Sequence, residues 1–182
     1  MFELAKIVNL WERFSRFMAY IGLISDTHGV FDPRIREFLE PVDEIWHAGD
    51  FGRGMDLAEE IAAFKPLKGV AGNCDNHELR FLHPLHRFFK CEGMYVLMTH
   101  IGGYPGRYDI KARELLDRYH PDIFVCGHSH ILKVVRDPKR DGMLVINPGA
   151  AGIQGFHLVR TALRFKIEAG QIKDMEVFEL DR

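Results

Sequence analysis

Five short apolar segments in this chain each end in aspartate, asparagine or histidine residues. The segments are 20–25, 44–48, 66–71, 94–100 and 122–126, and the polar residues at their ends are Asp26, His28, Asp50, Asn73, His100, His128 and His130. Short apolar runs bounded by turn residues are typical of buried β-strands. In open α/β sheets, ligands bind beyond the carboxyl ends of the strands. The sequence therefore predicts that these seven side chains share one crevice.

Helical segments alternate with the apolar segments. Pro33 opens one over 33–40, a second covers 55–64, and a third covers 109–120, where Pro121 ends it. Repetition of strand, polar turn and helix indicates βαβ units, an α/β fold class and a largely parallel sheet. The chain after residue 131 has the pattern of strands and hairpins, with Gly142 and Gly170 at turns.

The composition of the chain argues against several classes of function. The chain has 182 residues, with 24 basic and 26 acidic side chains and a formal net charge of −2. This balance gives no general electrostatic attraction to nucleic acid, and we expect no membrane span because no apolar window is long enough. Cys74, Cys91 and Cys126 are too few and too scattered for a disulfide framework or a zinc finger. They favour reduced thiols and a cytoplasmic location.

The first 19 residues are expected to form an amphipathic helical extension (1–19) to a single domain that spans 20–182. Apolar residues recur there at the three- and four-residue spacing of a helix face: Leu4, Ile7, Val8, Trp11, Phe14 and Met18. We expect this helix to pack either on the domain or on a second subunit. The second arrangement would make the chain a homo-oligomer. A membrane-surface helix is an alternative, and so is an upstream start with Met18 as the natural initiator.

The seven polar residues offer two carboxylates, four imidazoles and one amide oxygen. That set is too large for one tetrahedral ion and suits two octahedral ions that share a bridge. Two divalent ions about 4 Å apart need a bridging anion, and Asp50, on a tight turn after Gly49, suits that position. Asp26 and His28 are expected on one side of their loop, because alternate residues of extended chain point the same way. Mixed nitrogen and oxygen ligands favour Mn²⁺, with Fe²⁺, Zn²⁺ or Ni²⁺ as alternatives, over Mg²⁺ or Ca²⁺.

Five sequence blocks together resemble the calcineurin-like metallophosphoesterase superfamily, and within it the short YfcE-type phosphodiesterases. The blocks are Asp26-Thr27-His28, Gly49-Asp50, Gly72-Asn73-Cys74-Asp75, Thr99-His100 and Gly127-His128-Ser129-His130. The resemblance implies a four-layer α/β/β/α sandwich of two mixed sheets. It also implies that Asp26, His28, Asp50 and His130 hold one ion. Asp50, Asn73, His100 and His128 would hold the other, and Asp50, Asn73 and His100 would be catalytic.

One position departs from the pattern of this superfamily, where a histidine often follows the asparagine. Cys74 stands there, which puts a dedicated general acid in doubt; a buried, inert thiol is our preferred interpretation and a proton-donating thiol the alternative. Asp75 is a candidate to orient a ligand and Arg107 a candidate to contact substrate phosphate, with a surface arginine as the alternative for Arg107. His47 is predicted to be a core residue. The remaining histidines are predicted to be surface or loop residues without a role: His77, His83, His86, His120 and His157.

The resemblance implies metal-dependent hydrolysis of phosphodiesters, with monoesters as further substrates, by in-line attack of a hydroxide that bridges two divalent ions. The expected partner is a small phosphoester. A non-catalytic protein-binding scaffold, as in the retromer subunit of this fold, is the alternative; it would tolerate an eroded ligand set, whereas all seven positions are filled here. A DNA nuclease would bring basic DNA-binding segments, which the sequence lacks.

Overall fold

The computed structural model describes residues 18–182. The predicted helical extension therefore lies outside the described residues, with the exception of Met18 and Ala19. These two residues were wrongly assigned to the extension. Strand β1 spans Met18–Ile24, and from Met18 onward it pairs with residues 163–168 of strand β11. Met18 and Ala19 are thus part of the first sheet.

The first sheet has the order β12-β11-β1-β2-β3. Strands β1, β2 (Glu44–His47) and β3 (Leu67–Gly69) run parallel. Helices α2 (Pro33–Phe38) and α3 (Asp56–Phe64) connect them. Strands β11 (Val159–Glu168) and β12 (Gln171–Asp181) add an antiparallel hairpin beside β1.

The second sheet has the order β4-β5-β8-β10-β9. Its central strands β5 (Met94–Thr99), β8 (Ile123–Val125) and β10 (Met143–Pro148) run parallel. Strands β4 (His86–Cys91) and β9 (Leu132–Asp137) flank them in antiparallel pairs. Both sheets are mixed, so the largely parallel sheet that periodicity indicated was wrong, whereas the two mixed sheets implied by the resemblance are confirmed.

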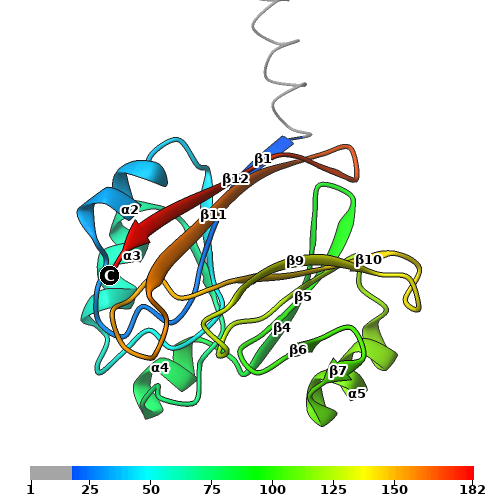
Figure 1. Cartoon of the computed structure of the whole chain (residues 1–182), viewed down its shortest axis with the longest axis horizontal. Coiled ribbons are helices and arrows are strands. Elements are labelled where there is room, and N and C mark those ends of the chain that lie inside the picture. Colours follow the sequence, from blue (N-terminus) through cyan, green and yellow to red (C-terminus); the bar gives the residue numbers. More distant parts are fainter. Residues whose placement is uncertain (1–17) are drawn as a thin grey trace, which may run out of the picture.

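Three apolar clusters separate four layers (Figure 1). Residues alternate along each buried strand, as the two-residue period of a strand requires. In β1, Ile21 and Leu23 face the second sheet, whereas Ile24 faces α2 and α3. In β8, Ile123 faces the first sheet and Phe124 faces helix α5 (Ile110–Tyr119). The predicted α/β/β/α sandwich is therefore confirmed.

Two elements were not anticipated from the sequence. Helix α4 (His77–Leu82) follows the Asn73 loop, and the Asn76 side chain accepts a hydrogen bond from the Leu79 N–H at its start. A short hairpin, β6 (Gly103–Tyr104) and β7 (Arg107–Tyr108), precedes α5. Among residues 18–182, no helix combines the length and apolar character that crossing a bilayer requires.

Candidate metal centre

The carboxyl ends of five strands, β1, β2 and β3 in one sheet and β5 and β8 in the other, deliver the seven predicted residues to one edge of the sandwich. Backbone hydrogen bonds join the loops that follow these strands. The Asp26 N–H donates to Gly49 O (2.9 Å), the His28 N–H to Asp50 O (3.1 Å) and the Gly127 N–H to His100 O (2.9 Å). The predicted crevice is thus formed by two sheets rather than by neighbouring strands of one.

Left-handed backbone conformation turns most of these side chains inward. Asp26, His28, Asp50, His128 and His130 have φ angles of 53°, 47°, 57°, 68° and 57°. Such angles are uncommon outside glycine and cluster at functional sites. Asp26 and His28 lie on the same side of their loop, as expected. The reason given for this was wrong, because the backbone there is left-handed and not extended. Gly49 (φ +104°) is required next to them, because a Cβ there would collide with the His100 ring.

Asp26 is a buried carboxylate with one satisfied oxygen and one orphaned oxygen. Its Oδ2 accepts hydrogen bonds from Ser25 Oγ (2.6 Å) and from the His128 N–H (3.0 Å). Its Oδ1 has no hydrogen-bond partner among residues 18–182. A buried carboxylate oxygen without a donor is costly, and a cation at that oxygen would remove the cost.

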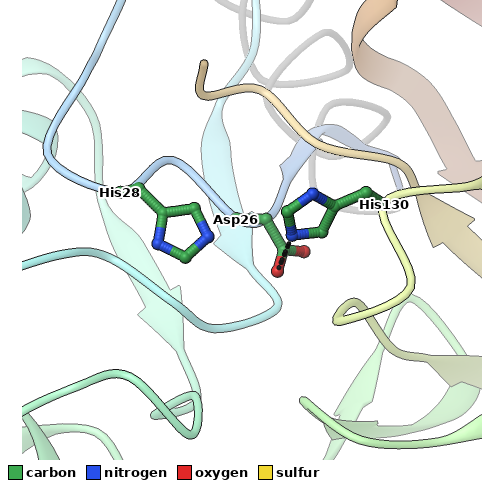
Figure 2. A group of neighbouring side chains, drawn as sticks. All are labelled: Asp26, His28 and His130. Atoms are coloured by element: carbon green, nitrogen blue, oxygen red, sulfur yellow. Dashed lines mark ion pairs between the residues drawn. The ribbon is translucent and has the colours of Figure 1, made fainter. Parts of the chain in front are cut away.

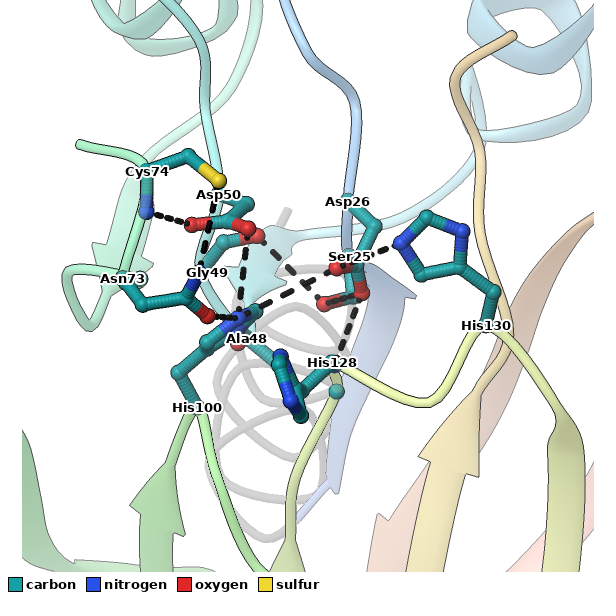
Figure 3. A network of polar contacts seen from close by, with 12 residues as sticks. Ser25, Asp26, Ala48, Gly49, Asp50, Asn73, Cys74, His100, His128 and His130 are labelled. Carbon is teal, nitrogen blue, oxygen red and sulfur yellow. Dashed lines mark hydrogen bonds and ion pairs between the residues drawn. The ribbon is translucent and has the colours of Figure 1, made fainter. Parts of the chain in front are cut away.

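His100 aims its second ring nitrogen at the same point. The Nδ1 atom lies 2.8 Å from Ala48 O, an acceptor only, so Nδ1 carries the hydrogen in the neutral ring. The Nε2 atom then presents a lone pair to Asn73 Oδ1 (3.0 Å) and Asp50 Oδ2 (3.3 Å) (Figure 3). Burial opposes protonation of this ring, but the Asp50 and Asp26 carboxylates raise the pKa of His100 above its ordinary value. The surroundings of Nε2 therefore favour positive charge.

The ring of His130, like that of His100, is oriented by a hydrogen bond at Nδ1. Its partner is His157, a residue for which the sequence predicted no role. His157 Nε2 lies 3.0 Å from Gly152 O and must donate to it, which leaves His157 Nδ1 as an acceptor for His130 Nδ1–H at 3.1 Å. His130 Nε2 is then a lone pair 3.1 Å from the orphaned Asp26 Oδ1. Burial lowers the pKa of His157, which keeps its ring neutral for this task. His157 lies in a loop, as predicted, but no sequence signal indicated its contact with His130.

Asp50 lies between the two histidine arrangements. Its Oδ1 accepts the Cys74 N–H (2.8 Å), and its Oδ2 faces His100. Burial alone would raise the pKa of Asp50, but the contacts with His100 and Cys74 lower it below its ordinary value. Asp50 is thus ionised at neutral pH and central enough to serve both halves of the site.

His28 and His128 complete the set from opposite sides. His28 and His130 flank the Asp26 carboxylate (Figure 2), and one ligand atom of each of these three residues lies within 4.8 Å of the others. The same criterion groups Asp26, Asp50 and His100. The exposed His128 ring lies 5.3 Å from the His100 ring, measured between centroids. His128 and His130 thus point to different halves of the site.

Cys74 differs from the preferred prediction of a buried thiol, because it is exposed. Its Sγ atom lies within 4.8 Å of ligand atoms of His28 and Asp50. Partial burial and the Asp50 carboxylate raise the pKa of Cys74, so the thiol stays protonated at neutral pH. It is therefore a weak nucleophile.

Asp75 and His47 fasten the loops rather than point into the site. The buried Asp75 accepts the Gly52 N–H (3.1 Å) and the Gly72 N–H (2.7 Å), so it ties two loops together and contacts no histidine ring. His47 is a buried core residue, as predicted, and its Nε2 contacts Thr27 Oγ1 at 2.8 Å. His83, predicted to be a surface or loop residue, directly follows helix α4 and is buried, stacked on Phe51.

The donors fit two divalent cations. When both rings are neutral, in the tautomers described above, three acceptor atoms converge: the orphaned Asp26 oxygen and the Nε2 lone pairs of His100 and His130. The set combines imidazole nitrogens with carboxylate and amide oxygens, which suits Mn²⁺, Fe²⁺ or Zn²⁺. Backbone or imidazole partners fix two of the histidines from behind, as is usual for metal-bound histidine.

Comparison with known proteins identifies the family of this chain. The calcineurin-like phosphoesterase superfamily domain matches residues 20–170, and the chain belongs to that superfamily. An uncharacterized protein of Methanocaldococcus jannaschii is 34% identical over 70 residues, which are 35% of this chain and 32% of that protein. This chain thus aligns with about a third of the length of that relative.

Solved structures share the fold at low identity. A predicted phosphoesterase from Streptococcus pneumoniae has a TM-score of 0.63 and 21% identity, and the match covers 91% of this chain and 98% of that one. Vps29 from Entamoeba histolytica, solved with Zn²⁺, has a TM-score of 0.62 and 16% identity over 88% of this chain and 98% of that one. At such identities the likeness supports the fold alone.

The His157 contact predicts a measurable effect on metal binding. Replacement of His157 by Ala removes the acceptor that orients His130, so we expect the affinity for one of two ions to fall about 10–100-fold. His157→Asn keeps an acceptor near the Nδ1 position and is expected to recover most of the affinity. Isothermal titration with Mn²⁺ measures both, with the exposed His77→Ala as the control. Equal affinity in His157→Ala and His77→Ala would show that the contact is incidental.

Proposed function

We propose that this protein is a metal-dependent phosphodiesterase with two divalent cations, preferably Mn²⁺, in the site formed by the loops after β1, β2, β3, β5 and β8. The observation that carries the proposal is the convergence of the orphaned Asp26 Oδ1 with the His100 and His130 lone pairs. Asp26, His28, Asp50 and His130 would hold one ion. Asp50, Asn73, His100 and His128 would hold the other.

When bound, the two cations would supply Lewis acidity for a phosphoryl oxygen and a hydroxide nucleophile at neutral pH. The side chains of this protein fix where that chemistry occurs. Ala48 O and His157 hold the rings of His100 and His130 in the tautomers that leave Nε2 free. Asp26 and Asp50 contribute two negative charges, so a doubly loaded site keeps net positive charge and attracts a phosphate ester anion.

A metal and substrate panel tests this proposal. Metal-free protein is supplemented in turn with Mn²⁺, Zn²⁺, Ni²⁺ and Mg²⁺ and assayed with bis(4-nitrophenyl) phosphate and 4-nitrophenyl phosphate. We expect hydrolysis that requires added metal, with Mn²⁺ above Mg²⁺ and the diester above the monoester. Absence of hydrolysis with every metal, in protein shown to bind two ions, would refute the enzymatic assignment.

Cys74 is not required for this chemistry. Its raised pKa makes it a poor nucleophile, and substitution preserves the hydrogen bond from its backbone N–H to Asp50. We expect Cys74→Ser to keep kcat/KM within about tenfold, or ~1.4 kcal/mol, of the unmodified protein. A loss of several orders of magnitude would show that the thiol takes part in the reaction.

A protein-binding scaffold is the second candidate. One loop beside the site exposes large apolar side chains: Phe156 is fully exposed and Leu158 is 80% exposed. Apolar residues of this kind at a surface mark docking sites when they are grouped. The two functions are compatible, and only an inactive, fully metal-loaded protein would favour the scaffold alone.

The three free cysteines support our proposal of a reducing, cytoplasmic location.

A further inference from the structure

A cavity of about 330 Å³ lies between the β6–β7 hairpin and the start of β9. Its size falls in the range of about 300–1,000 Å³ that small-molecule sites occupy. Apolar side chains form most of its wall, among them Ile101, Ile131, Val145 and the rings of Tyr104 and Tyr108. This cavity is large enough for an organic group of nucleoside size.

The cavity shares a wall with the candidate metal centre. Gly127 and His128 line it, and they belong to the loop that also contacts Asp26 and His100. His128 faces the metal-centre side through its ring contact with His100 (Figure 3). A phosphate bound at the metals would therefore carry one of its ester groups to the mouth of this cavity.

Two aromatic rings are held in place at the cavity. Tyr108 donates a hydrogen bond from its hydroxyl to Asp137 (2.8 Å) and contacts Phe124 edge-to-face. Lys133 places its Nζ atom 3.8 Å from the centre of the Tyr104 ring, a cation–π contact. Such fixed rings form a surface suited to flat aromatic groups, which prefer offset-stacked or edge-to-face contacts.

The cavity also carries positive charge. Lys133 and Arg107 both line it, and neither forms an ion pair with a carboxylate in the part of the chain that the structure describes. Asp109, the one carboxylate in the wall, accepts the Lys111 and Ala112 N–H groups at the start of α5. The two cations are thus available as hydrogen-bond donors to a ligand.

We propose that this cavity binds a nucleoside as the ester group next to the scissile phosphate, with the base against Tyr104 and Tyr108 and with Lys133 and Arg107 as donors. The inference rests on the proposed phosphodiesterase function and names its substrate class: nucleotide phosphodiesters. The apolar wall requires an aromatic or apolar group, and the unpaired cations favour one that carries acceptors. A nucleobase meets both requirements, whereas an alkyl group meets only the first and a bare sugar only the second.

Calorimetric binding of two matched probes to the Mn²⁺-loaded protein tests this assignment. Adenosine 5′-monophosphate and ribose 5-phosphate share the phosphate and the sugar but differ in the base. We expect the nucleotide to bind about tenfold more tightly, the size expected from stacking one base on an aromatic side chain. Tyr104→Ala and Lys133→Ala are expected to bring the ratio of the two dissociation constants close to one, and Tyr104→Phe to preserve it.

The matched controls lie on other surfaces. Tyr95 is exposed to a degree similar to that of Tyr104 (46% and 38%), so Tyr95→Ala and the exposed Lys139→Ala are expected to leave the ratio unchanged. Equal binding of the two probes, no binding of the nucleotide, or a preference that survives both cavity variants would overturn the assignment. Because binding is measured without turnover, a preference for the nucleotide in an inactive protein would refute the proposed function and leave the nucleoside cavity standing.

Discussion

Asp50→Asn is expected to lower kcat/KM for bis(4-nitrophenyl) phosphate by at least about 1,000-fold, or ~4 kcal/mol. Asp50 contacts residues of both halves of the site, because its Oδ2 lies 3.3 Å from His100 Nε2 and 4.0 Å from His28 Nε2. Its replacement removes the negative charge that would hold two cations together. Mn²⁺-dependent turnover measured by release of 4-nitrophenolate gives the result.

The stability of this variant separates a lost function from a lost fold. The Asn side chain keeps an oxygen for the Cys74 N–H, and it removes one of two buried carboxylates that converge in the metal-free protein. The contacts with His100 and Cys74 that lower the pKa of Asp50 also stabilise the folded chain, so we expect the thermal midpoint of metal-free Asp50→Asn to fall only modestly, with the variant still folded. The exposed Asp181→Ala is the control and should change neither quantity. Turnover by Asp50→Asn close to that of Asp181→Ala would contradict the assigned role.

Metal binding is expected to raise the stability of the folded chain by an amount that a thermal scan resolves. At a free Mn²⁺ concentration about 100 times the dissociation constant, one site contributes about 2.7 kcal/mol. For a chain of this length that corresponds to a rise of about 5–10 °C in the midpoint of unfolding. The increase arises because the cation satisfies Asp26 Oδ1 and the His130 lone pair, which have no donor in the metal-free protein.

Asp26→Asn tests the origin of that increase. The variant keeps an oxygen for Ser25 Oγ and the His128 N–H but places an amide nitrogen beside His130 Nε2, where it can donate. We expect its metal-free form to be as stable as the unmodified protein and its response to Mn²⁺ to be reduced, because one of the two ions loses a ligand. An undiminished response would mean that the ions bind elsewhere on the surface.

The sequence predicted the parts of the fold that local pattern encodes. The alternation of apolar strands and helices gave β1, β2, β3, β5 and β8 and the helices α2, α3 and α5. The antiparallel edge of the first sheet depends instead on pairing between Met18 and Glu168, at opposite ends of the domain. No local pattern carries that information. Met18 and Ala19 were assigned to a helix because the apolar spacing before them continues into the first residues of the strand.

The seven ligand candidates were also predictable, because each follows an apolar strand and the carboxyl ends of such strands meet. The residues that support them were less so. His157 contacts His130 only because the Ala151 and Gly152 N–H groups bond to the carbonyl oxygens of Ser25 and Asp26, a tertiary contact without a sequence signal. The exposure of Cys74 likewise depends on how the Asn73 loop lies over Asp50.

Metal stoichiometry tests the central claim most directly. Purified protein is stripped with a chelator, dialysed against Mn²⁺, freed of excess metal and subjected to elemental analysis, beside Asp50→Asn and the Asp181→Ala control. The account predicts two ions per chain in the unmodified protein and in Asp181→Ala, and fewer than two in Asp50→Asn. One ion or none in the unmodified protein, or two ions that remain in Asp50→Asn, would contradict it.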